Sequence, residues 1–277
     1  MSAQRTLIAV ATATLLVPAL LTAQVPVTVE TDVVYSRTNG SAVLADIAYP
    51  VGASDLPVII YVHGGRWRSG ERVNAQGLQV AEWAGLGYFA MTVSYRLVGA
   101  TPAPAAYQDV QTAIRWVHAH AEEYGIDPDR IYMIGNSSGG HLVALAATLG
   151  EGPYERVGGW ENARSDVRAV ISAAGTYDLN TLSWGDLWTP TEGDVIEARK
   201  LASPIHHVGP NTKPILVVHS DDDRSVPIEQ AVDFVRALEA AGVEHHFVHY
   251  ADRGHMSVTD EVKEHTLAFI AEVEGGR

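Results

Sequence analysis

Apolar and polar positions recur along the chain with two different spacings. One spacing predicts strands and the other predicts helices. Two alternating segments, 25–35 and 43–49, flank Asn39-Gly40, a turn signal that predicts an antiparallel pair of strands. Farther along, short continuous apolar runs predict strands buried on both faces, and apolar residues three and four apart predict helices. The buried strands are expected at 58–62, 88–93, 130–135, 167–173, 214–219 and 244–250, and the helices at 75–86, 107–124, 138–149, 228–241 and 258–273.

The regular alternation of strand and helix predicts an α/β fold with a mostly parallel sheet of about eight strands, covered by helices on both faces. Two stretches, 150–166 and 177–204, interrupt this alternation and carry several Trp, Gly and Pro residues. The second is expected to form either a short lid or surface loops anchored by their aromatic side chains, so the cap is small or absent.

The first residues stand apart from the rest. Arg5 precedes an apolar run over 7–21, followed by Thr22-Ala23-Gln24, which is typical of a signal peptide spanning 1–23. The run is too short for a comfortable membrane span, so we expect no span in the mature form and a secreted or periplasmic protein. Residues 24–277 are then expected to form one catalytic domain, because a chain of 277 residues with 47% hydrophobic content can bury one large core.

The composition of the chain excludes several kinds of site and partner. The chain has no Cys, which excludes disulfides, cysteine nucleophiles and thiolate metal sites. A formal net charge of −14 argues against nucleic acid as a partner. His245 and His249 share one face of a strand, but no further ligand accompanies them, so neither a metal nor a cofactor is expected.

The segment Gly135-x-Ser137-x-Gly139 lies between a predicted strand and a predicted helix. A turn from strand to helix within a few residues is crowded, so small residues are needed on either side, and the residue at its apex points out of the fold. Ser138 cannot be the apex, because Asn136 would then have to be glycine. Ser137 is therefore the candidate nucleophile.

A serine hydroxyl needs a base, and the base needs an orienting acid. Gly254-His255 follows the last strand, so His255 can lean over the sheet edge where ligand sites gather. Three acids, Asp221, Asp222 and Asp223, follow the strand before it. For the oxyanion, the candidate donors are the amide of Ser138 at a helix start and the amides of Gly65 and Arg66, and His63 is expected to hold their loop.

These segments resemble the α/β-hydrolase esterases of the hormone-sensitive-lipase and feruloyl or acetylxylan esterase type. The similarity covers nearly the whole mature chain and rests on the following segments: His63-Gly64-Gly65-x-Trp67-x-x-Gly70, Asp109 with Arg115-Trp116-Val117, Tyr124-Gly125-Ile126-Asp127-Pro128-x-Arg130-Ile131, Gly135-x-Ser137-x-Gly139-Gly140-His141, Asp223-x-x-Val226-Pro227 and Gly254-His255. Where lipase-like members have three glycines the loop has two, Ser138 stands where many relatives have Ala, and Ser220 where many have Gly.

The resemblance implies a serine carboxylic-ester hydrolase that works through an acyl-enzyme on short-chain or aromatic esters, either small molecules or esters linked to polysaccharide. It implies Ser137 as nucleophile, His255 as general base and, from its distance to Val226-Pro227, Asp223 as the acid. Asp221 and Asp222 are then expected to be solvated loop charges or helix caps. A serine peptidase or an arylformamidase-like amidase has the same triad, and a non-catalytic binding protein is a further alternative. The sequence makes no prediction of oligomeric state.

Overall fold

The computed structural model describes residues 25–73 and 77–276, in which eight strands form one sheet of order β1-β2-β4-β3-β5-β6-β7-β8. The expected signal peptide at 1–23 lies outside the described residues. β1 pairs antiparallel with β2 and β2 with β4, and every other neighbouring pair is parallel. The strands are β1 (Val27–Thr38), β2 (Ser41–Pro50), β3 (Leu56–Val62), β4 (Phe89–Val93), β5 (Ile126–Asn136), β6 (Ala169–Ala173), β7 (Ile215–Ser220) and β8 (His245–Tyr250).

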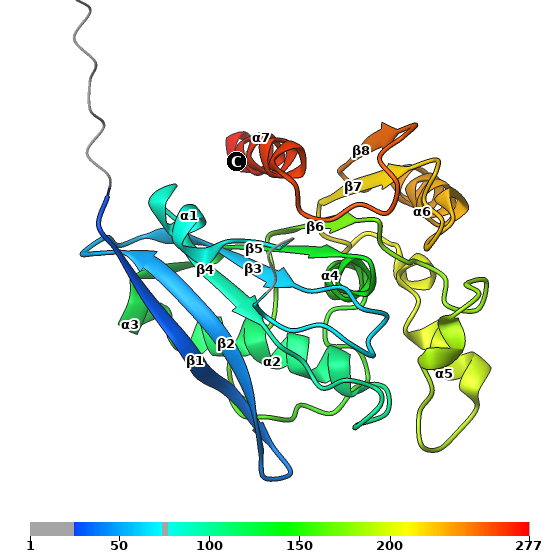
Figure 1. Ribbon diagram of the computed structural model, residues 1–277, viewed down its shortest axis with the longest axis horizontal. Coiled ribbons are helices and arrows are strands. Elements are labelled where there is room, and N and C mark those ends of the chain that lie inside the picture. Colours follow the sequence, from blue (N-terminus) through cyan, green and yellow to red (C-terminus); the bar gives the residue numbers. More distant parts are fainter. Residues whose placement is uncertain (1–24, 74–76, 277) are drawn as a thin grey trace, which may run out of the picture.

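Helices cover both faces of this sheet, and two apolar clusters form the core between the layers (Figure 1). One cluster packs under α2, α4 and α6, and the other under α1 and α7. The helices are α1 (Val80–Gly85), α2 (Ala105–Ala119), α3 (Ala121–Tyr124), α4 (Ser138–Thr148), α5 (Val195–Leu201), α6 (Ile228–Ala241) and α7 (Asp260–Gly275), with short 3₁₀ turns η1 (Gly185–Leu187) and η2 (Pro204–His207). The predicted α/β-hydrolase architecture is confirmed.

The hairpin of β1 and β2 turns at Asn39-Gly40, as the sequence predicted. Asn39 and Gly40 both have positive φ, 51° and 80°. This conformation matches the twist of the flanking strands, which is why Asn-Gly is favoured there.

Several predicted boundaries were wrong for physical reasons. The helix expected at 107–124 is divided into α2 and α3 at His120, whose ring stacks on Trp116 and bonds its carbonyl oxygen. The helix expected at 75–86 is only α1, and 74–76 lie outside the described residues. β5 begins before Pro128 rather than after it, because the register shift between Leu56 and Val58 of its neighbour accommodates the proline.

The parallel strands bring distant loops to one edge. Val62 pairs with Gly135, Asn136 with Ala173, and Ser220 with Tyr250 at the carboxyl ends of the strands. The loops after β3, β5, β7 and β8 therefore open at the same edge of the sheet.

The segment 177–204 lies beside this edge and is anchored by its aromatic side chains. Tyr177, Trp184 and Trp188 are buried, and both tryptophans pack against Trp67 of the loop after β3. Of the two expectations for this segment, the contacts favour anchored loops. Within 25–73 and 77–276, no helix is both long enough and apolar enough to cross a bilayer.

Candidate active site

Ser137 occupies a strained turn between β5 and α4. Its φ is 55° and its ψ is −123°, a conformation that costs a non-glycine residue about 1–3 kcal/mol. Small neighbours make the turn possible, because a Cβ at Gly139 would lie 2.0 Å from the Val62 oxygen and one at Gly135 would lie 2.5 Å from Gly139. The amide of Ser137 donates to the Ala173 oxygen at 2.9 Å, which fixes the turn against β6.

Asp223 and His255 meet although they come from different loops. The Nδ1 atom of His255 donates to Oδ2 of Asp223 at 2.7 Å. The other oxygen of Asp223 accepts from the amides of Ser225 at 2.8 Å and Val226 at 3.0 Å. Because an ionised carboxylate only accepts, Nδ1 of His255 carries a proton, and in the neutral ring the lone pair is then on Nε2.

The Asp223 side chain is fully buried, yet it stays ionised. Burial by itself would raise its pKa, but the hydrogen bonds from His255 and from the two loop amides outweigh burial and hold the pKa below its usual range. His219 supports the same loop, since its buried Nε2 donates to the Val226 oxygen at 2.9 Å. Burial lowers the pKa of His219, so this ring is neutral.

Asp222 ties the loop after β7 (221–227, the acid loop) to the loop after β8 (251–259, the histidine loop), a role that the sequence did not reveal. Its Oδ1 accepts from the Ser220 hydroxyl and from the amide of Gly254, each at 2.7 Å. Ser220 Oγ in turn accepts from the amide of Arg253 at 2.9 Å. These bonds lower the pKa of Asp222, so this exposed loop charge, expected to be solvated, also holds two loops together. Asp221 is exposed and bonds His249 instead.

The loop after β3 has an unusual backbone. Gly65, Arg66 and Trp67 have φ of 122°, 56° and 57° in succession. The Gly65 oxygen accepts from the amides of Arg68 and Ser69, each at 3.0 Å, which closes the loop. A Cβ at Gly64 would lie only 3.1 Å from the Cβ of Ser137, so this loop runs directly beside the candidate nucleophile.

His141, one turn into α4, fastens this loop to the segment 177–204. Trp67 Nε1 donates to His141 Nδ1 at 3.2 Å, and His141 Nε2 donates to the Ala202 oxygen at 2.7 Å. Complete burial lowers the pKa of His141 to about 4, so both bonds involve the neutral ring. At the start of the loop, buried His63 donates from Nδ1 to the Gly64 oxygen and stacks on Tyr95, as expected of a histidine that holds the loop.

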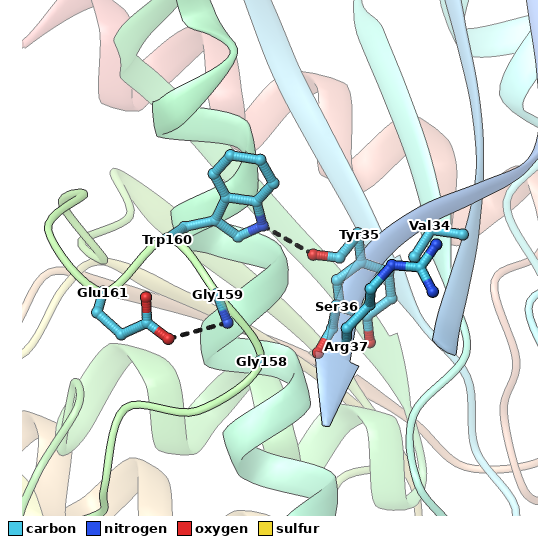
Figure 2. Close-up of a pocket in the computed structure, with 8 residues that line it drawn as sticks. All are labelled: Val34, Tyr35, Ser36, Arg37, Gly158, Gly159, Trp160 and Glu161. Atoms are coloured by element: carbon cyan, nitrogen blue, oxygen red, sulfur yellow. Dashed lines mark hydrogen bonds between the residues drawn. The ribbon is translucent and has the colours of Figure 1, made fainter. Parts of the chain in front are cut away.

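A pocket of about 480 Å³ lies elsewhere, between β1 and the loop 158–161 (Figure 2). In it, Trp160 donates to the Tyr35 oxygen at 2.9 Å, and the amide of Gly159 donates to Glu161 at 3.1 Å (Figure 2). None of the predicted site residues lines this pocket, so we assign it no part in the reaction. Among the residues that the structure describes, no group of three or more His, Asp or Glu side chains could hold a metal.

The predicted residues thus gather at one edge. Ser137 and Ser138 end β5 and begin α4, Asp223 and His255 are hydrogen-bonded, and Gly65 and Arg66 belong to the adjoining loop. The arrangement is that of a nucleophile elbow at the same edge of the sheet as a histidine–carboxylate pair. Their catalytic roles stay predictions.

Comparison with known proteins identifies the family of the chain. The model of the BD-FAE family matches residues 45–238, which is more than half of the chain. The chain is 32% identical over 195 residues to the probable carboxylic ester hydrolase LipM of Mycobacterium tuberculosis, covering 66% of this chain and 44% of LipM. It is 36% identical over 197 residues to the esterase LipQ of the same organism, covering 67% of this chain and 46% of LipQ. The chain therefore spans about half the length of the curated relatives it matches.

Solved structures show the same fold. A truncated carbohydrate esterase from gut microbiota superposes with a TM-score of 0.74 at 27% identity, covering 91% of this chain and 98% of that one. The butyrate-bound esterase Est2 of Thermogutta terrifontis has a TM-score of 0.75 at 27% identity, covering 88% and 94%. The chain therefore belongs to the BD-FAE family and is similar in sequence and fold to serine esterases of the α/β-hydrolase type.

Proposed function

We propose that the protein hydrolyses carboxylic esters with a Ser137–His255–Asp223 triad. The observation that carries the proposal is the 2.7 Å bond from His255 to buried Asp223 at the edge where Ser137 occupies its strained turn. That bond leaves Nε2 of His255 as the base, because Nδ1 already holds its proton. Esterases among the sequence relatives and among the solved structures of the same fold support this reaction class.

In the proposed mechanism, Nε2 of His255 takes the proton of the Ser137 hydroxyl as the oxygen attacks the ester carbonyl. The imidazolium is stabilised by ionised Asp223, and it then protonates the departing alcohol. Water attacks the acyl-enzyme by the same route, with His255 first as base and then as acid. The carboxylic acid leaves and Ser137 regains its proton.

The oxyanion of the tetrahedral intermediate is proposed to meet the amides of Gly65, Arg66 and Ser138. The close approach of the loop after β3 to Ser137 supports the first two, and the position of Ser138 at the start of α4 supports the third. Such donors act where charge develops, and losing one costs on the order of 3 kcal/mol in the barrier.

We propose short-chain or aromatic esters as substrates, either small molecules or esters linked to polysaccharide. Support comes from the relatives alone: one solved esterase of this fold holds butyrate and another is a carbohydrate esterase. We also propose that the protein is exported after loss of residues 1–23, which N-terminal sequencing of the mature protein would test.

A fluorophosphonate probe and paired substrates test the reaction. We expect the probe to label the wild-type protein and to fail on Ser137→Ala, while Ser183→Ala, which changes an exposed serine of the segment 177–204, keeps the label. Hydrolysis of 4-nitrophenyl acetate should exceed that of a matched peptide 4-nitroanilide and of an N-formyl arylamine. Undiminished labelling of Ser137→Ala would refute the nucleophile, and faster cleavage of either amide would replace the esterase by an amidase.

A further inference from the structure

Arg66 places a cation beside the proposed reaction centre. It follows Gly65 directly, and its own amide is one of the proposed oxyanion donors. The neighbouring Gly64 touches the nucleophile turn, since a Cβ there would lie 3.1 Å from the Cβ of Ser137. The backbone of Arg66 therefore lies close to the nucleophile turn, and its side chain is long enough to reach a substrate bound there.

The guanidinium has a fixed support. Its Cζ atom lies 5.5 Å from the centroid of the Trp184 ring. Trp184 is itself held, because its Nε1 donates to the Ser225 oxygen at 2.9 Å and its ring packs on Trp67 at 5.1 Å. Ser225 is two residues beyond Asp223, so this support joins the acid loop to the loop after β3. A cation held over an anchored indole loses part of its freedom before any ligand arrives.

Within the described part of the chain, this cation has no anionic partner. Among the described residues, no carboxylate lies within ion-pair distance of Arg66, although the chain carries 33 acidic residues. The acids of the acid loop are engaged elsewhere: Asp221 with His249, Asp222 with Ser220 and Gly254, and Asp223 with His255. Arg66 is exposed, and a guanidinium presents a planar fork of N–H donors that matches the two oxygens of a carboxylate.

We propose that Arg66 binds a carboxylate on the substrate, so that the site favours esters carrying a negative charge a few bonds from the ester carbonyl. The inference rests on the proposed esterase function and deepens it by naming a substrate class. In a protein with net charge −14 such substrates are repelled overall, so their preference would depend on this local cation.

Two pairs of esters test the inference on either side of the scissile bond. Mono-ethyl glutarate and ethyl pentanoate share a five-carbon acyl chain, and only the first carries a carboxylate. The acetate ester of 4-hydroxybutyrate and butyl acetate place the charge on the alcohol side. For each protein, acid release in a pH-stat gives the ratio of kcat/KM for the charged ester over its neutral partner. A shared change in oxyanion stabilisation cancels in this ratio.

In at least one pair, we expect Arg66→Gln to lower the ratio by about fivefold, the upper range for an exposed ion pair. Arg66→Lys should keep part of the preference, because it retains the charge without the planar fork. Lys213→Gln removes an equal charge just before β7, at the opposite edge of the sheet, and should leave the ratio unchanged. Raising the salt from about 0.01 M to about 1 M should narrow the gap between the wild-type and Arg66→Gln ratios, because the screening length falls from about 30 Å to about 3 Å and the repulsion from the net charge acts on both proteins.

Equal ratios in the wild type and Arg66→Gln for both pairs would overturn the inference. Arg66 would then be an ordinary exposed side chain that does not contact the substrate. An equal fall in Lys213→Gln would also overturn it, because net charge would then explain the preference. Failure of the proposed function looks different: Ser137→Ala would keep its turnover of butyl acetate. Loss of that turnover in Ser137→Ala, with a ratio indifferent to Arg66, would reject only the carboxylate site.

Discussion

Neutral His141 should make the stability of the protein fall as the solution is acidified. The ring lies fully buried between Trp67 and Ala202, and it accepts from the first and donates to the second. Protonation of Nδ1 would destroy the bond from Trp67 and place an unpaired charge in the core. The folded protein therefore resists protonation, and the unfolded chain does not.

The magnitude follows from the two pKa values. Burial lowers the pKa of His141 to about 4, against about 6.5 in an unfolded chain. The difference of about 2.5 units corresponds to about 3 kcal/mol of unfolding free energy. Because the depressed value belongs to the folded state, this contribution is complete above about pH 6.5. It is lost as the pH falls towards about 4, because between these two pH values His141 takes up a proton when the protein unfolds.

Urea unfolding followed by tryptophan fluorescence, at intervals between about pH 4 and pH 8, measures this effect. In His141→Gln the group does not titrate, so the stability advantage of the wild type should shrink by about 3 kcal/mol across that range. Buried His63 is common to both proteins and cancels. His206→Gln, which changes an exposed histidine, should follow the wild-type curve. A difference between wild type and His141→Gln that stays constant over the whole range would refute the assignment of a neutral, buried ring.

Three further changes probe the loops at the strand ends. Asp222→Ala removes the acceptor that holds the histidine loop and should lower kcat about tenfold in an ester assay, with Asp221→Ala, on the exposed neighbour, close to wild type. Gly65→Ala sets a Cβ 2.0 Å from the Ser69 oxygen at φ 122°, so kcat should fall on the order of a hundredfold while circular dichroism stays native; full activity would exclude this loop from the oxyanion site. Asp223→Asn loses the carboxylate, and steady-state kinetics should show kcat lower by about four orders of magnitude; a tenfold loss would be too small for an orienting acid.

Much of the fold could be predicted where the signal is local. The amphipathic pattern of α6 begins after Pro227 and ends at Gly242, so its predicted bounds of 228–241 match the structure. Asn39-Gly40 marked the hairpin because few other residues tolerate two successive positive φ angles. Ser137 could be found because its turn constrains residues on both sides of it.

Features that depend on tertiary contacts could not be predicted in this way. Nothing in the spacing of Ser220 and Asp222 shows that they reach the amides of Arg253 and Gly254, since those contacts require β7 and β8 to lie side by side. His141 belongs to the motif at the nucleophile, yet its partners come from two other loops. The break between α2 and α3 likewise follows from ring contacts that the helical period does not encode.

The left-handed backbone at Arg66 has a consequence for directed evolution. A side chain at φ 56° costs roughly 1–2 kcal/mol that glycine would not incur. A library screened for heat resistance alone would therefore enrich glycine at this position and discard the guanidinium with it. A substitution at this one position would then raise thermal stability and lower the preference for charged over neutral esters.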